Sequence, residues 1–239
     1  MNVHMAPGKI YLIPTPISGS DPLEYLSPAA LKILPALDYL LVENARTIRR
    51  FLSKIGIREI ERIHIETLDK RTSREEILNL LVPVKKGNTA GILSEAGCPG
   101  IADPGSNFIR EAHRENITVV PLPGPSSIFL GLMASGFNGQ QFVFHGYLPI
   151  DARQRANKIR DMELQSRKLG QTQIFMETPY RNNQLVKGLL LNLKNTTRLC
   201  IAAGLTGNEE FIGTRSIGAW KKQVPDLNKI PAIYLLSSD

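Results

Sequence analysis

The chain has 239 residues, 42% of them apolar and 21% charged, with two cysteines and a formal net charge of +7. This apolar share is sufficient for a hydrophobic core, which excludes a disordered or fibrous chain, and the lack of any run of about 18 apolar residues excludes a transmembrane helix. We expect a soluble cytoplasmic protein with no signal peptide, disulfide framework or metal site, because the N-terminal residues lack a basic start and apolar core and cysteines are few.

The first half of the chain alternates predicted strands with predicted helices. Short apolar runs predict strands at residues 9–13, 39–42, 90–93 and 117–120. Cap residues and apolar spacing predict helices at residues 29–37, 47–55, 77–82 and 107–114, and an apolar helix from about 126 to 136. The capping box at Ser73–Glu76 marks the start of one of them. Strands separated by helices of this length predict an α/β domain with a parallel sheet.

The second half contains strands that follow one another with little helix between them. Strands are predicted at residues 142–149, 173–176, 198–202, 210–217 and 232–236, and helices at residues 153–168 and 181–193. The close succession of the last strands predicts a mixed sheet. We place the domain boundary between about residues 120 and 150, and assign domains to 1–122 and 123–239.

Positive charge is concentrated in one segment. Residues 1–150 contain 15 basic and 14 acidic residues, whereas residues 151–200 contain 10 basic and 4 acidic residues. The main contributors flank or lie in one predicted helix: Arg153, Arg155, Lys158, Arg160, Arg167 and Lys168. Clustered positive charge is typical of a protein that binds a polyanion, and it is equally typical of a solvated helix face. The charge therefore favours a nucleic-acid partner without establishing one.

Four loops follow predicted strands and are rich in Gly, Pro, Ser or carboxylates: the first at residues 14–20, the second at 43–46, the third at 94–105 and the fourth at 121–127. Ligands of open α/β sheets bind at the carboxyl ends of the strands. Glycine allows a close backbone approach and proline holds a loop rigid, so these loops suit an adenosine-containing ligand. The dinucleotide, phosphate-loop and serine-hydrolase signatures G-x-G-x-x-G, G-x-x-x-x-G-K-S/T and G-x-S-x-G are absent.

The order and the amino-acid sequences of several stretches resemble those of the tetrapyrrole methylase-like (class III) S-adenosylmethionine methyltransferases. The stretches are Ser94–Gly105, Pro121–Ser126, Ala134–Gly136, Phe144–Pro149 and Glu177–Arg181. Within that family they are most similar to the branch that 2′-O-methylates a cytidine ribose in small-subunit ribosomal RNA. The resemblance implies a two-domain α/β fold, a homodimer, and S-adenosyl-L-methionine bound in a cleft between the domains.

The resemblance also implies which residues bind the donor, and the basic segment together with Arg181 supplies the expected RNA-binding residues. The loops at 15–20, 94–99 and 124–127 would line the donor pocket. The expected donor-binding residues are Pro16, Ser94, Ala96, Gly97, Pro99, Gly124, Ser126, Ser127 and Glu177. The expected RNA-binding residues are Arg153, Arg155, Lys158 and Arg181.

The chain departs from the family pattern at three places. The second loop reads Glu43-Asn44-Ala45-Arg46 where the family usually has Glu-Asp-Thr-Arg, and the third has Glu95 and Cys98 in place of Asp and Thr. A charged Arg-Glu-Leu-Thr-Lys stretch is replaced by residues 203–207. This loss supports an alternative hypothesis, a non-catalytic RNA-binding or ribosome-assembly protein. The fold also permits a porphyrinoid methyltransferase.

A ribose hydroxyl is a weak nucleophile at neutral pH, so its methylation benefits from a general base. The candidates are Glu43, Glu95, Asp103 and Glu177. Glu95 is our first choice because it lies in the glycine-rich third loop, although it can equally serve only to accept hydrogen bonds from loop amides. We expect Arg46 to anchor a phosphate or ribose, although it can equally pair with Glu43 across one helical turn. Asp103 precedes a proline at a predicted helix start, which favours a capping role.

Overall fold

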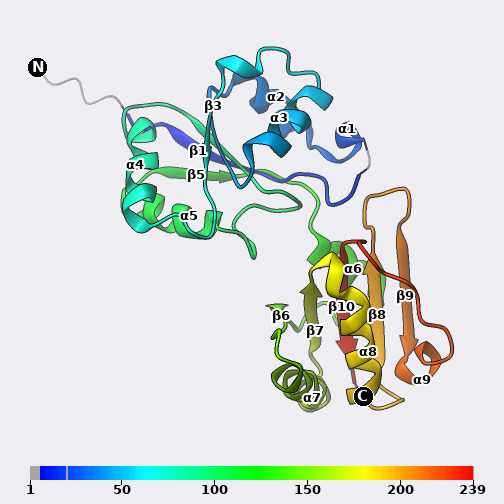
Figure 1. Cartoon of the computed structure of the whole chain (residues 1–239). Coiled ribbons are helices and arrows are strands. Elements are labelled where there is room, and N and C mark those ends of the chain that lie inside the picture. The colour runs from blue at the N-terminus through cyan, green and yellow to red at the C-terminus, as the bar shows by residue number, and fades with distance from the viewer. Residues whose placement is uncertain (1–5, 20, 239) are drawn as a thin grey trace, which may run out of the picture. The chain divides into compact units, whose positions relative to one another are not determined.

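The computed structural model describes residues 6–19 and 21–238, so residues 1–5, Ser20 of the first loop and Asp239 lie outside the described residues. The chain folds as two compact units, Met1–Ser126 and Ser127–Asp239, each with its own sheet and core (Figure 1). In the assignment made from the sequence, residues 123–126 belong to the second domain, whereas in the structure they group with the first unit. Within the described residues, no helix combines the length and apolar character needed to cross a membrane.

The first unit is built on a parallel five-stranded sheet in the order β3-β2-β4-β1-β5. Its strands are β1 (Lys9–Ile13), β2 (Tyr39–Val42), β3 (His64–Thr67), β4 (Ala90–Leu93) and β5 (Thr118–Pro121). Every residue of β2 and β4 is buried, as expected for inner strands of a parallel sheet covered on both faces. The sequence predicted four of the five strands, and β5 begins one residue later than predicted.

β3 was not predicted because it is an edge strand with little apolar signal. Its sequence is His-Ile-Glu-Thr, and both ends are exposed. On the exposed side, His64 and Glu66 pair with each other at 2.8 Å. Polar residues are common on edge strands, where they discourage pairing with another chain. Because β3 was not predicted, the segment after it, which belongs to the candidate site, was also overlooked.

Helices cover both faces of this sheet. They are α1 (Pro22–Tyr25), α2 (Pro28–Ile33), α3 (Ala45–Lys54), α4 (Arg74–Lys85) and α5 (Gly105–Arg114), with 3₁₀ turns η1 (Leu34–Ala36) and η2 (Ile60–Arg62). Leu41 of β2 packs with residues of α4 and α5, whereas its neighbours Leu40 and Val42 pack with α2 and α3. Since alternate side chains of a strand point to opposite faces, the two core clusters lie on opposite sides of the sheet. The predicted capping box of α4 is present, with Ser73 and Glu76 each bonding the other's backbone N–H.

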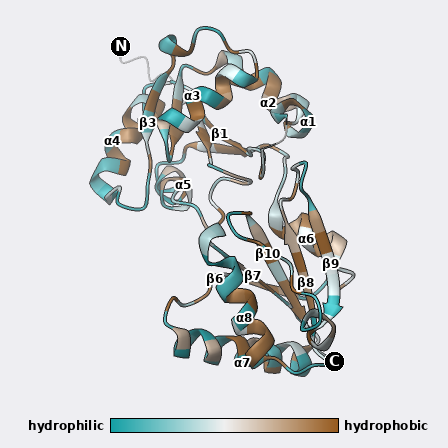
Figure 2. Ribbon diagram, turned by 45° about the vertical axis from the view of Figure 1, so that its right-hand side comes forward, coloured by the Kyte–Doolittle hydropathy of each residue, from teal (hydrophilic) through white to brown (hydrophobic). Residues whose placement is uncertain are grey.

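The second unit contains a mixed sheet, as the sequence predicted, with five strands in the order β6-β7-β10-β8-β9. Its strands are β6 (Phe142–Tyr147), β7 (Thr172–Glu177), β8 (Arg198–Ala203), β9 (Phe211–Ser216) and β10 (Ala232–Ser237). Only β6 and β7 run parallel, and the other neighbours are antiparallel. The strands are mainly hydrophobic in colour in Figure 2, which agrees with their position at the centre of the unit.

Helices also cover this second sheet on both faces. They are α6 (Ser127–Ser135), α7 (Ala152–Leu169), α8 (Asn182–Asn192) and α9 (Ile217–Trp220), with a 3₁₀ turn η3 (Pro179–Arg181). The main core includes Tyr234 of β10 together with residues of α7 and α8. On the other face, Gly131 of α6 lies so close to Ile233 and Leu235 that a Cβ there would meet them at 3.0–3.1 Å. The sheet is therefore packed between α6 and the α7–α8 pair.

α3 begins two residues before its predicted start because Asn44 caps it. The Asn44 side-chain Oδ1 accepts hydrogen bonds from the backbone N–H groups of Arg46 (3.0 Å) and Thr47 (3.1 Å). We expect Asn44→Ala to lower the free energy of unfolding of the first unit by about 1 kcal/mol, the usual cost of a lost N-cap. Asn44→Asp is the control, since an aspartate accepts both bonds. Urea denaturation measures both variants, and an alanine variant as stable as the unchanged chain would contradict this role.

Candidate functional site

The four loops singled out in the sequence lie in a row at one edge of the first sheet. Parallel strands β2, β4, β1 and β5 are neighbours in this order. Their carboxyl ends therefore place the second, third, first and fourth loops side by side. This is the edge at which open α/β sheets bind ligands.

The first and third loops are joined by a short antiparallel bridge between Thr15 and Gly97. Each backbone N–H donates to the other residue's carbonyl oxygen at 3.0 Å. The Thr15 hydroxyl also donates to the Ser94 carbonyl oxygen at 3.0 Å, and the Ser94 hydroxyl donates to the Gly97 carbonyl oxygen at 2.6 Å. Gly97 has φ +74°, a conformation that favours glycine. These buried bonds fix the two loops as one rigid unit.

The fourth loop is held against the first and the third. The Cys98 thiol donates to the Pro125 carbonyl oxygen at 3.4 Å. Burial raises the pKa of this thiol, and a hydrogen bond with Ser126 only partly opposes that rise, so Cys98 stays protonated and suits packing rather than nucleophilic attack. Gly124 lies directly on Pro14, where an added Cβ would come within 2.5 Å of the proline Cβ. Only glycine allows this close approach of the two loops.

Carboxyl groups of the second and third loops meet at the same edge. Burial is the largest cause that raises the pKa of Glu43 to about 7, followed by a side-chain hydrogen bond to Asp103 and the negative charges of Asp103 and Glu95. The positive charge of Lys70 acts in the opposite direction. Two carboxyl groups in hydrogen-bond contact share a proton, because both cannot be charged at little cost. Glu43 and Glu95, two of the candidate bases, are thus brought together with Asp103.

Asp103 holds the third loop in shape as well as contacting Glu43. One oxygen, Oδ1, accepts from the backbone N–H groups of Gly100 (2.8 Å) and Gly105 (2.7 Å), the second of which is the first residue of α5. A Cβ at Gly105 would lie 2.7 Å from this same oxygen. Ala102, between them, has φ +55°. The expected capping role of Asp103 is therefore present, and its contact with Glu43 is additional.

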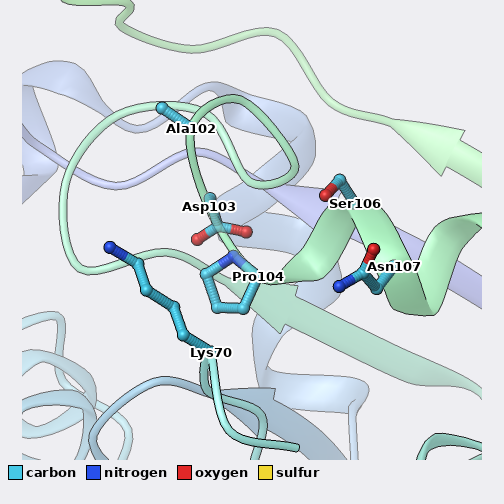
Figure 3. A pocket seen from close by; sticks show the side chains of 6 residues that line it. All are labelled: Lys70, Ala102, Asp103, Pro104, Ser106 and Asn107. Carbon is cyan, nitrogen blue, oxygen red and sulfur yellow. The ribbon is translucent and has the colours of Figure 1, made fainter. Parts of the chain in front are cut away.

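A pocket of about 310 Å³ opens beside these carboxyl groups. In Figure 3 the Lys70 side chain rises from the segment after β3 alongside the Asp103 carboxylate, and α5 forms the other wall. The lining residues are Lys70, Ala102, Asp103, Pro104, Ser106 and Asn107. Sequence reasoning missed Lys70 because it missed β3. The signal that was available is a lysine following a short run of alternating residues.

The expected donor-binding residues of the first unit gather in the interlocked loops. Ser94, Gly97 and Pro99 are buried, and the first two are engaged in loop contacts. Ala96 and Gly124 are exposed, and Pro16 is half-buried. The accessible surface of these expected donor-binding residues therefore consists of backbone and small side chains, which leaves room for a flat nucleoside. Larger side chains of the third loop, Glu95 and Ile101, are also exposed. Within the described residues, no group of three or more His, Cys, Asp or Glu is arranged to hold a metal ion.

The other two expected donor-binding residues, Ser127 and Glu177, belong to the second unit. Ser127 begins α6. Glu177 ends β7, with a side chain only 1% exposed, and its Oε1 accepts from the Arg181 guanidinium at 2.6 and 3.1 Å and from the Thr178 backbone N–H at 2.7 Å. Arg181, expected to bind RNA, is thus the ion-pair partner of an expected donor-binding residue. The pair braces the turn between β7 and α8.

The basic residues of α7 differ in what they contact. Arg155 is only 6% exposed, and its guanidinium donates to the carbonyl oxygens of Pro149 (3.2 Å) and Ile150 (2.7 Å). It therefore closes the turn before α7 and offers little accessible surface to RNA. Arg153 is exposed. The charge of Lys158 adds to burial in lowering the pKa of His145, which places this lysine near the end of β6.

Residues 203–207, where the family's charged stretch is missing, form a tight turn after β8. Gly204 has φ +60°, and a Cβ there would meet the Glu209 carbonyl oxygen at 2.8 Å. The Gly207 N–H donates to the Gly204 carbonyl oxygen at 2.9 Å, and the Thr206 N–H donates to the Glu210 carboxylate at 3.0 Å. The substituted residues therefore support a compact turn that a larger residue at 204 would not permit.

Comparison with known proteins finds a family that matches most of the chain. Residues 9–219 match the model of the family described as tetrapyrrole (corrin/porphyrin) methylases. A relative from Thermotoga maritima is 32% identical over 183 residues, which cover 77% of each chain. A relative from Escherichia coli O157:H7 is 29% identical over 219 residues, which cover 90% of this chain and 73% of the relative. Both are named ribosomal RNA small subunit methyltransferase I.

The fold is also that of a solved structure, the methyltransferase CobJ. The two chains superpose with a TM-score of 0.65 over 97% of this chain and 94% of the other, at 15% identity. The similarity extends to both units and confirms the predicted fold class. The chain therefore belongs to the tetrapyrrole (corrin/porphyrin) methylase family, whose members are methyltransferases that use S-adenosylmethionine as the methyl donor.

Proposed function

We propose that this chain methylates the 2′-hydroxyl of a ribose in small-subunit ribosomal RNA, with S-adenosyl-L-methionine as the donor, and that it acts as a cytoplasmic homodimer. The observation that carries the proposal is the joining of four loops at the carboxyl edge of the first sheet, with Glu43 and Asp103 in contact. The ribosomal RNA substrate is supported by the names of two relatives that cover most of the chain.

The interlocked first, third and fourth loops are proposed to hold the donor. Ala96 and Gly124 are exposed and small, so backbone groups near them are accessible for hydrogen bonds to a nucleoside. When bound, S-adenosylmethionine supplies an electrophilic methyl group on a sulfonium sulfur. Rigid loops serve this reaction because methyl transfer needs an in-line arrangement of the two reactants, and positioning supplies much of the acceleration.

Glu43 is proposed as the general base. Its pKa of about 7 matches a base that works near neutral pH, because about half of it is deprotonated there and the carboxylate is basic enough to accept a hydroxyl proton. Asp103 orients it through their hydrogen bond, and Glu95 adds negative charge that makes Glu43 more basic. Arg46, exposed in the first turn of α3, is proposed to bind the RNA near the reacting ribose. Glu95 itself is the second candidate for the base.

Small ribosomal subunits are the expected substrate. Purified full-length protein, incubated with methyl-labelled donor and subunits, is expected to label the ribosomal RNA at a position that resists alkaline cleavage, as a 2′-O-methylated ribose does. A label in the base would contradict ribose methylation. Turnover of any RNA would exclude the non-catalytic alternative, and labelling of a porphyrinoid in place of RNA would support the third hypothesis.

Gly124→Ala is expected to weaken binding of S-adenosylhomocysteine at least tenfold. Its Cβ would lie 2.5 Å from the Pro14 Cβ, so the first and fourth loops must separate. Gly139→Ala is the matched control, because a Cβ at Gly139 meets nothing within 4 Å. Isothermal titration calorimetry measures both affinities. Equal affinity of the two variants would show that the loops do not form the donor site.

Glu43→Gln is expected to lower the methylation rate about 10²-fold or more, the usual contribution of a general base. In the unchanged enzyme the rate should fall about tenfold per pH unit below pH 7, because protonated Glu43 accepts no proton. The glutamine variant should lose this acid limb. Glu61→Gln, an exposed carboxylate of η2, is the control and should change neither the rate nor the profile.

Asp103→Asn separates the proposed base from its partner. The asparagine Oδ1 still accepts from Gly100 and Gly105, but the charge that raises the pKa of Glu43 is removed. The acid limb should therefore move to lower pH. An acid limb that stays in place in this variant would assign it to another group.

A further inference from the structure

One face of α3 is unusually basic. Within ten residues the helix contains Arg46, Arg49, Arg50 and Lys54 and no acidic residue, and all four cations are exposed. At 100° per residue the four span roughly 140° of the helix surface. The opposite face carries Ile48 and Leu52, which are buried against the sheet. The basic residues therefore form a single stripe directed away from the core.

These cations have no partners within the part of the chain that the structure describes. None of the four takes part in an ion pair or a side-chain hydrogen bond there. Several other basic residues of the first unit are compensated: Arg62 pairs with Asp38 and Glu59, and Arg74 and Arg114 pair with Glu111. On α3, by contrast, four uncompensated cations lie within nine residues and on one face.

The second basic helix, α7, is different. It contains Asp161 and Glu163 among its cations. Its Arg155 is buried on carbonyl oxygens, and Arg160 donates to the side chains of Asn157 (2.6 Å) and Asn192 (2.8 Å). The other cations of α7 are spread over 16 residues, whereas α3 places its four within nine residues and has no acidic residue among them.

The arrangement of α3 costs the free protein stability. Like charges four residues apart, as in Arg46–Arg50 and Arg50–Lys54, repel each other. Arg46 and Arg49 also lie near the helix N-terminus, where the macrodipole disfavours positive charge. A partner that supplies negative charge would remove both penalties.

The stripe starts at the candidate active site. Arg46 lies one helical turn from Glu43, at the carboxyl end of β2, and Lys54 lies eight residues further, about 12 Å along the helix axis. Guanidinium groups bind phosphate through paired hydrogen bonds. We propose that this face of α3 binds the phosphate backbone of the RNA on one side of the reacting ribose. This inference rests on the function proposed above and assigns the substrate a path over the first unit.

The test replaces the three cations outside the proposed catalytic set, as Arg49→Gln, Arg50→Gln and Lys54→Gln together. A matched control removes three exposed lysines elsewhere, as Lys86→Gln, Lys187→Gln and Lys222→Gln. Binding of full-length protein to small-subunit ribosomal RNA is measured between 50 and 300 mM KCl. We expect the α3 variant to bind at least tenfold more weakly at 100 mM KCl, with a salt slope reduced by roughly 2, about 0.7 per lost phosphate contact.

Further readouts separate docking from a loss of folding. The α3 variant should melt at the same temperature as the unchanged chain or higher, because the repulsion is relieved. Both variants should bind S-adenosylhomocysteine as the unchanged chain does, and the control should keep its RNA affinity within about twofold. Equal losses in the two variants would overturn the proposal, since they would reflect net charge alone.

Measurements on the unchanged chain separate a failure of the α3 docking surface from a failure of the proposed function. If it methylates RNA and the α3 variant keeps the same affinity and salt slope, the docking surface is overturned and the proposed function stands. If it neither binds nor methylates RNA, both are overturned. Vesicles of phosphatidylglycerol and phosphatidylcholine supply the remaining comparison: vesicle binding lost in the α3 variant, with RNA affinity retained, would assign the face to an anionic lipid surface.

Discussion

The backbone pairing of Thr15 with Gly97 is the interaction on which the candidate site depends. It joins loops that follow β1 and β4, and the hydroxyl groups of Thr15 and Ser94 reinforce it from the buried side. Once these two loops are fixed, the fourth loop packs on them through Gly124 and Pro125, and the third loop can present Asp103 to Glu43. The contact between the carboxyl groups of Asp103 and Glu43 therefore depends on backbone contacts between the loops.

Much of the fold followed from the sequence because its local signals agree with the tertiary structure. Three strands of the first sheet have the predicted limits, since inner strands of a parallel sheet are continuous apolar runs. The capping box fixed the start of α4. β3 was missed because an edge strand needs no such run, and α9 because four residues give no helical period. Asn44 was noted as a departure from the family, but its capping bonds appear only in three dimensions.

The site was predicted less completely than the fold. Sequence reasoning chose loops that the structure brings together at one sheet edge, because strand ends and glycine-rich stretches can be recognised in the sequence. It could not order Glu43, Glu95 and Asp103 by function, since burial and contact between loops determine which carboxyl group has the raised pKa. It also counted Arg155 among RNA-binding residues, although this guanidinium lies on carbonyl oxygens. The net charge of a segment shows where cations are numerous, but it does not show which of them already bind other groups of the protein.

The positions of the site are of two kinds, which differ in the substitutions that they accept. Gly105 and Gly124 have no room for even one more carbon atom, so mutation there is closed to every other residue unless the loops move apart. Glu95 and Asn44 are exposed, and Cys98 needs only a donor that reaches Pro125. Those are among the positions at which this chain differs from the usual family pattern. Substitutions there can change the acidity and capping of this edge, while the close contacts at Gly105 and Gly124 remain restricted to glycine.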